Sequence, residues 1–303
     1  MFLLKPAIKT YLWGGDTLIR EFGKEGTRAA ESWEFSVHPD GECQILSGAY
    51  AGQTLAAYLR QKGIDFPILV KLIDAAQPLS VQVHPDDRYA RAHENSPGKT
   101  ELWVILRAEP GAFLYLGLKA PVSAQALREA VRLGQAESLL QKVSVRAGEA
   151  YYIPAGMLHA IGAGIVLAEV QQSSNVTYRV YDYGRRDANG QTRELHIEKA
   201  LAVASLAPVS AVPPGMGHTR RAGDAPVFTI ARTAYFTVER LPLDGTVRLP
   251  AQEKGYLCAL CAAGEADADD GETALPLRKG TSLFIERADI VTLRGQAELL
   301  LIS

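Results

Sequence analysis

The sequence predicts a mainly β protein with two domains, each built from short antiparallel strands. Short apolar runs broken by glycine and proline recur along the chain, the first three at 7–13, 31–37 and 43–46, which is typical of an antiparallel sheet or barrel. Residues 205–226 are rich in proline and glycine and have no periodicity, which indicates a linker. The 303 residues suffice for two cores. We therefore expect domains at 1–210 and 220–303.

Composition narrows the classes of partner. The net charge of −2 and the pI near 6.3 give no reason to expect nucleic acid or an anionic membrane. The sequence has no apolar run of about 18 residues, and the first apolar run is too short for a signal peptide. We expect a cytoplasmic protein that acts on a small molecule, as a monomer or a homodimer.

Helical patterns occupy four stretches. Thr54–Lys62 has a capping threonine and is followed by Gly63, a helix stop. Residues 86–94 begin with two aspartates, which suit a helix N-terminus. Residues 123–141, capped by Ser123, have helical spacing and predict a helical insertion at about 120–142 in the first domain. Residues 197–204 predict a short helix at the end of this domain.

Strands and a turn account for most of the remainder. The predicted strands of the first domain include 102–106, 112–117, 140–145, 151–153, 165–172 and 176–183, and a turn is expected at 187–190. The predicted strands of the second domain are 228–231, 236–241, 255–262, 283–286 and 298–302.

Candidate metal ligands lie on two predicted strands. Residues 79–84 alternate as a half-buried strand does, which puts Gln82 and His84 on one face. Glu101 begins a second apolar run. If the two strands pair, the Glu101 carboxylate lies beside Gln82 and His84.

His159 ends a recognisable motif. The spacing from Gly148 to His159, Gly-x5-Pro-x-Gly-x2-His, resembles the second motif of the cupin family, in which the turn presents the histidine to a metal inside a small barrel. Gln82-x-His84 stands where the family's first motif usually has His-x-His, and Glu101 lies farther away than usual. This departure indicates a particular branch of the family.

The full set resembles the type I mannose-6-phosphate isomerases in their short bacterial form. Besides the four ligands, the resemblance rests on Lys71, Lys99 and the segment 175–185, and it weakens after residue 210. It implies two cupin-type (jelly-roll) β-barrels with a few inserted helices, the C-terminal barrel being degenerate and metal-free. It also implies one divalent ion per chain, with zinc favoured, although mixed nitrogen and oxygen ligands also admit manganese, iron, cobalt or nickel.

The resemblance further implies the interconversion of mannose 6-phosphate and fructose 6-phosphate through an enediolate. Arg179 matches the family's catalytic arginine, and Lys99 matches an active-site lysine. Lys71 stands in an apolar strand, where a charge is costly unless it is paired or lies at an opening, and we assign it to substrate binding. Arg185 adds positive potential for a phosphate. Glu169 is a candidate partner of a ligand histidine or of one of these bases.

Two questions stay open at this level. His84, Glu169, Lys99 and a water molecule on the metal are all candidates for the proton-abstracting base. An iron dioxygenase with a His/Glu/His triad, and a sugar-phosphate-binding cupin without activity, are the alternative functions.

Overall fold

A computed structural model describes residues 1–186, 189–223, 225–250, 255–286 and 290–303. These residues form two compact units. Unit 1 comprises residues 1–9, 16–72 and 213–303, and unit 2 comprises residues 10–15 and 73–212. The division into domains 1–210 and 220–303 stays a prediction. Unit 1 combines the C-terminal strands with residues 1–9 and 16–72, which we expected in the first domain.

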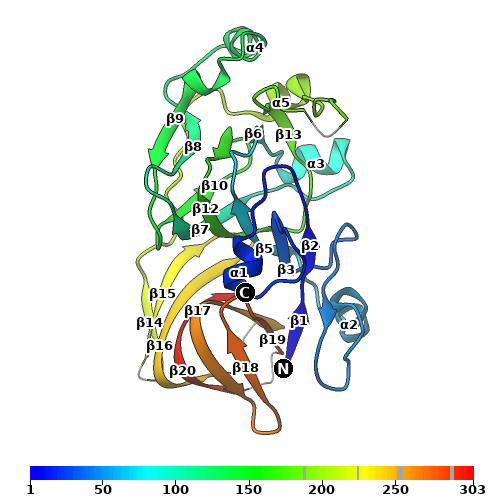
Figure 1. Cartoon of the computed structure of the whole chain (residues 1–303), viewed down its shortest axis with the longest axis vertical. Coiled ribbons are helices and arrows are strands. Elements are labelled where there is room, and N and C mark those ends of the chain that lie inside the picture. Colours follow the sequence, from blue (N-terminus) through cyan, green and yellow to red (C-terminus); the bar gives the residue numbers. More distant parts are fainter. Residues whose placement is uncertain (187–188, 224, 251–254, 287–289) are drawn as a thin grey trace. The chain divides into compact units, whose positions relative to one another are not determined.

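Unit 1 is dominated by one antiparallel sheet, in the order β14-β15-β16-β20-β17-β19-β1-β4, with β18 paired to β17. Figure 1 shows β16, β17 and β20 as long curved strands. The strands of this sheet are β1 (Phe2–Lys5), β4 (Gln44–Ile45), β14 (Thr219–Ala222), β15 (Ala225–Arg232), β16 (Thr237–Leu249), β17 (Tyr256–Asp269), β18 (Ala274–Arg278), β19 (Ser282–Glu286) and β20 (Val291–Ile302). The other elements are β2 (Ala7–Lys9), α1 (Thr17–Phe22), β3 (Glu31–Phe35), α2 (Leu55–Lys62) and the start of β5 (Ile68–Ala75).

Strand alternation builds the core of unit 1. Leu257, Ala259 and Cys261 are alternate residues of β17, and all three lie in the same buried cluster, as the two-residue period of a strand requires. Cys258 belongs to the opposite face, and both cysteines are free and buried. The C-x-x-C spacing therefore reflects packing in a strand.

Unit 2 contains two groups of antiparallel strands. One has the order β13-β6-β11-β8-β9, and in the other β7 pairs with β10 and with β12. The strands are β6 (Val81–Val83), β7 (Glu101–Ala108), β8 (Phe113–Leu118), β9 (Leu140–Ser144), β10 (Ala150–Ile153), β11 (His159–Ile161), β12 (Ile165–Gln172) and β13 (Tyr178–Tyr181). The helices are α3 (Asp87–His93), α4 (Ala124–Arg132), η1 (Ala136–Leu139) and α5 (Ile197–Val203).

Local capping rules explain where three helices begin. The side chains of Thr54, Asp86 and Ser123 each accept a hydrogen bond from the backbone N–H three residues later, at the start of α2, α3 and α4. Gly63 ends α2 with φ 65°, in the left-handed region that glycine adopts without strain. These helix starts and the end of α2 were expected from the sequence.

Two expectations need correction. The strand of Glu101 does not pair with the strand of Gln82: β7 lies between β10 and β12, and β6 lies between β11 and β13. The stretch 205–226 is not wholly a linker, because Thr219–Ala222 form β14 and pair with β15. The turn expected at 187–190 falls partly outside the described residues. No helix in the described part of the chain is both long and apolar enough to cross a membrane.

Candidate metal centre

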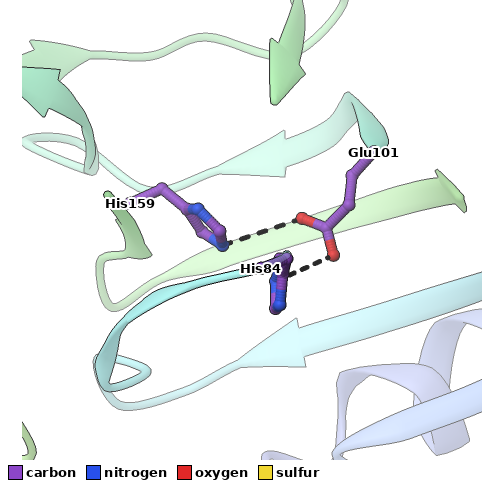
Figure 2. A group of neighbouring side chains, drawn as sticks. All are labelled: His84, Glu101 and His159. Atoms are coloured by element: carbon purple, nitrogen blue, oxygen red, sulfur yellow. Dashed lines mark ion pairs between the residues drawn. The ribbon is translucent and has the colours of Figure 1, made fainter. Parts of the chain in front are cut away.

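Three buried side chains in unit 2 converge on one point. His84 is 1% exposed, and Glu101 and His159 are 0% exposed. One ligand atom of each lies within 4.8 Å of the others. Figure 2 shows the two imidazole rings flanking the carboxylate, with Nε2 of His84 3.3 Å and Nε2 of His159 3.8 Å from its oxygens. Two histidines and a carboxylate at this spacing can bind a divalent metal.

The strand register brings the histidines together. His159 on β11 lies directly opposite Gln82 on β6, and Arg179 on β13 lies opposite Gln82 on the other side. The turn before His159 is tied to the first histidine, because the N–H of Gly156 donates to the carbonyl of His84 at 2.9 Å. Gly156 has φ 85°, so this turn needs a residue that tolerates the left-handed region.

Glu101 comes from the other strand group. It is the first residue of β7 and lies opposite Gln171 of β12. Trp103, two residues later on the same face, lies opposite Glu169. The carboxylate therefore approaches the histidines from β7, which pairs with neither β6 nor β11. This is why the predicted convergence of Glu101 and His84 is found although the predicted strand pairing is wrong.

Backbone carbonyls orient both imidazole rings. Nδ1 of His84 lies 2.9 Å from the carbonyl oxygen of Val176, and Nδ1 of His159 lies 2.8 Å from that of Met157. A carbonyl only accepts, so each Nδ1 carries the proton and donates. Each Nε2 then keeps a lone pair directed at the centre, as a metal-ligating histidine requires.

The charges of the site favour the metal-binding protonation states. Burial, followed by the positive charge of Lys99, lowers the pKa of His84 to about 3, and burial also lowers the pKa of His159. Burial alone would raise the pKa of Glu101, but nearby groups, first of all the positive charge of Lys99, outweigh burial and hold that pKa well below its usual value. At neutral pH both rings are neutral and the carboxylate is ionised.

The Glu101 carboxylate indicates that a cation fits here. Lys99 forms an ion pair with Oε1, yet neither oxygen accepts a hydrogen bond of normal geometry from any residue that the structure describes. Burying an ionised carboxylate with so few hydrogen-bond donors costs free energy of folding. Two neutral imidazoles, which have lone pairs but no charge, do not relieve this cost. A divalent ion bound by all three groups would relieve it.

Two more predicted residues border this group. The amide nitrogen of Gln82 lies 3.4 Å from Nε2 of His159, so a half-turn of the amide directs its oxygen toward the centre. Nζ of Lys99 lies 3.3 Å from Nε2 of His84, and this lysine is 4% exposed.

Glu169 is linked to the ligand His159 through the side chain of Trp103. Its Oε2 accepts a hydrogen bond of 2.9 Å from the indole N–H of Trp103. The Trp103 ring in turn packs edge-on against His159, with centroids 5.4 Å apart. Trp103 was not predicted as a site residue, although its place two residues after Glu101 puts both on one strand face.

The predicted arginines lie around one aspartate of the segment after β13. Arg185 forms an ion pair with Asp182 and donates to the carbonyl of Pro78 at 2.6 Å. Arg193, which the sequence analysis did not single out, also binds Asp182. Arg179 donates to the carbonyl of Glu194 at 3.0 Å, and burial followed by the nearby charge of Arg193 lowers its pKa. Arg185 and Arg193 thus share one carboxylate, and the charge of that carboxylate also acts on Arg179.

Lys71 belongs to unit 1. It lies 3.6 Å from the carboxylate of Glu31 and over the ring of Trp33, with Nζ 5.1 Å from the ring centroid. This ion pair accounts for the charge in an apolar strand.

Comparisons with known proteins show the family to which the chain belongs. The family description "Phosphomannose isomerase type I, catalytic domain" matches residues 1–101, and "Mannose-6-phosphate isomerase, cupin domain" matches residues 227–303. The mannose-6-phosphate isomerase ManA of Bacillus subtilis is 37% identical over 293 residues, covering 93% of this chain and 91% of that protein. The mannose-6-phosphate isomerase of Streptococcus mutans is 36% identical over 293 residues, with the same coverage.

A solved structure extends the similarity to the whole fold. The crystal structure of the mannose 6-phosphate isomerase from Bacillus subtilis superposes with a TM-score of 0.93 at 32% identity, covering 100% of this chain and 99% of that one. The predicted family and the mainly β, cupin-type fold are confirmed. The chain belongs to the type I phosphomannose isomerase family of enzymes.

Proposed function

We propose that the protein is a zinc-dependent isomerase that interconverts mannose 6-phosphate and fructose 6-phosphate through an enediolate. The observation that carries the proposal is the buried group of His84, Glu101 and His159 in a chain that is 37% identical to a mannose-6-phosphate isomerase. Gln82 would complete the ligand set with its amide oxygen. Two nitrogen ligands favour zinc among the divalent ions that such a site admits.

The reaction moves a proton between C2 and C1 of the sugar and shifts the carbonyl group between the same carbons. A bound divalent ion supplies a Lewis acid that polarises sugar oxygens. The protein must then hold the sugar, supply a base and place fixed positive charge near the oxygen that becomes negative.

We assign the base to Glu169. The lone pair of His84 on Nε2 would bind the metal, and its Nδ1 proton is donated to the carbonyl of Val176. Lys99 is ion-paired with Glu101, so it suits hydrogen-bond donation to a sugar oxygen better than proton abstraction. Glu169 is a buried carboxylate, 3% exposed, and it accepts a hydrogen bond from Trp103, whose ring packs against the ligand His159.

The phosphate group would be attracted by the arginines. Arg179, Arg185 and Arg193 contribute three positive charges near the two carboxylates of Asp182 and Glu194, an excess of positive charge that suits a phosphate group. Among them, Arg179 lies on the strand next to Gln82, so we assign it to the oxyanion that develops near the metal. Lys71 remains a proposed substrate-binding residue. We further propose that the enzyme works in the cytoplasm on this small substrate, without nucleic-acid or membrane partners, as its near-neutral net charge suggests.

The direct test is to incubate the zinc-loaded protein with mannose 6-phosphate and to measure fructose 6-phosphate. Product should form, and the reverse reaction should give mannose 6-phosphate from fructose 6-phosphate. A loaded protein that binds the sugar phosphate without turning it over would replace this proposal with a binding cupin. Consumption of dioxygen by an iron-loaded sample would replace it with an oxygenase.

A further inference from the structure

Two residues of the centre lie where the loop between α3 and β7 ends and β7 begins. Lys99 is in this loop and Glu101 is the first residue of β7, with Thr100 between them. Their functional groups meet, because Nζ of Lys99 is ion-paired with Glu101 and lies 3.3 Å from Nε2 of His84. A displacement of this backbone segment would therefore move a metal ligand and the adjacent cation together.

Gln172 holds the middle of this segment from one side. Its Oε1 accepts a hydrogen bond of 3.0 Å from the N–H of Thr100, and its own N–H donates to the carbonyl of Thr100 at 3.2 Å. Its Nε2 donates to Oδ1 of Asp87 at 3.1 Å. Gln172 is the last residue of β12 and is 5% exposed. These hydrogen bonds are therefore shielded from water, and the loss of one leaves a buried polar group without a partner, which costs free energy.

Asp87 holds the segment from the other side. The oxygen that binds Gln172 also accepts a hydrogen bond of 2.9 Å from the N–H of Gly98, and the N–H of Lys99 donates to the carbonyl of Pro85 at 3.0 Å. At Gly98 a Cβ atom would lie 2.5 Å from backbone atoms of Asp86 and Asp87. The loop passes so close to the start of α3 that only glycine fits there.

We propose that Gln172 and Asp87 form a clamp that positions Glu101 for metal binding and Lys99 for hydrogen bonding to the substrate. Both are positioning residues, since they act on the backbone on either side of Lys99 through directed hydrogen bonds. The effect on catalysis rests on the proposed isomerase function, whereas the effect on the backbone and on metal affinity does not. Groups that orient metal ligands in this way commonly change metal affinity about 10- to 100-fold when removed.

Four variants isolate the clamp. Gln172→Leu keeps the approximate size and removes both side-chain hydrogen bonds. Gln172→Glu still accepts from Thr100 but sets a carboxylate against that of Asp87. Adding Asp87→Asn to Gln172→Glu restores the contact, because an asparagine amide can donate to the new carboxylate while its oxygen accepts from Gly98. Asp86→Ala is the matched control: it removes the cap of the same helix, a hydrogen bond from the N–H of Tyr89 at 2.8 Å, and leaves the clamp intact.

Three measurements test the effect of each variant on the clamp. They are hydrogen exchange at the Thr100 amide, zinc affinity by competition with a chelator, and steady-state kinetics giving kcat and KM. Gln172→Leu should exchange faster at Thr100 by about tenfold, since one buried hydrogen bond is lost, and should bind zinc about tenfold more weakly. Its kcat should fall while KM changes little. Gln172→Glu should show the same losses, and the added Asp87→Asn should recover most of them. Asp86→Ala should speed exchange in α3 and leave Thr100 exchange and zinc affinity as in the wild type.

Two results would overturn the clamp. One is a folded Gln172→Leu, or Gln172→Glu should the leucine variant not fold, with wild-type exchange at Thr100 and wild-type zinc affinity. The other is an equal loss in Asp86→Ala, which would mean that general loosening of the helix is the cause. If the wild type does not isomerise mannose 6-phosphate, the proposed function fails, and the exchange and zinc data still decide the clamp.

Discussion

The indole N–H of Trp103 donates a hydrogen bond of 2.9 Å to Oε2 of Glu169, from the position directly across the β7–β12 pair. Because the same indole ring packs against His159, it ties the proposed base to a proposed metal ligand. The distance between the two groups is thereby set by a rigid side chain.

Removing the indole donor should therefore impair catalysis more than metal binding. Trp103→Phe keeps an aromatic ring beside His159 and leaves Glu169 without this donor. We expect kcat to fall at least tenfold and the pKa of the base, read from the pH dependence of kcat/KM, to rise, because a hydrogen bond to the ionised carboxylate is lost. Zinc affinity should stay near that of the wild type. An unchanged kcat and pH profile would show that Trp103 serves packing alone.

Lys99 should act through its charge and its proton together. Lys99→Met removes both, and we expect kcat to fall about 100-fold, the lower range for loss of one hydrogen-bond donor to a developing oxyanion. Lys99→Arg keeps the charge beside Glu101 with a different geometry, so it should bind zinc no more tightly than the methionine variant, because a cation beside the ligands repels the metal, and it should not recover kcat. Steady-state kinetics and chelator competition on the two variants check this. Full activity of Lys99→Arg would show that the charge suffices.

Neighbouring arginines offer a matched pair for the phosphate site. Arg185 belongs to the cluster around Asp182, whereas exposed Arg186 donates to the carbonyl of Gly190 at 2.6 Å. Arg185→Met should raise KM for mannose 6-phosphate about tenfold, the loss of one charge-assisted contact, with a smaller effect on kcat. Arg186→Met should leave KM unchanged. Equal effects in the two variants would mean that overall charge, and not a local contact, attracts the phosphate.

The aspartate at the centre of this cluster predicts a pH dependence of stability. Burial raises the pKa of Asp182, but hydrogen bonds from Arg193 and Arg185 outweigh burial and leave that pKa below its ordinary value. The folded state thus prefers the ionised form. The stabilisation is complete above the unfolded pKa of about 3.9 and is lost as the pH falls through the lower, folded value.

Asp182→Asn tests this sign. In urea unfolding of the metal-free protein at pH 7, the variant should be less stable by about 1.5–3 kcal/mol, the range for hydrogen bonds to a charged group. The difference should shrink as the pH drops below about 4. A difference that is constant from pH 7 to pH 3 would mean that the ionisation of Asp182 does not stabilise the fold.

The sequence predicted most of the local structure and the residues of the centre. It could not predict the residues that position them through hydrogen bonds. Helix starts such as Asp86 follow from capping chemistry, and His159 follows from a turn motif, so both are local. The partners of β7 depend on contacts between distant segments, and the strand of Glu101 was therefore assigned to the wrong neighbour. The bonds from Gln172 to Thr100 and from Trp103 to Glu169 depend on strand register, which no short pattern in the chain encodes.

We expect one metal ion, bound by His84, Glu101 and His159, to be required for turnover. Titration of the chelator-stripped protein with zinc, while fructose 6-phosphate formation is followed, tests this requirement. Activity should rise linearly and level off at about one equivalent per chain, as expected for a single tight site, and Glu101→Gln should show no such rise. Full turnover by the stripped protein, or an unaltered titration in Glu101→Gln, would contradict the assignment of this centre.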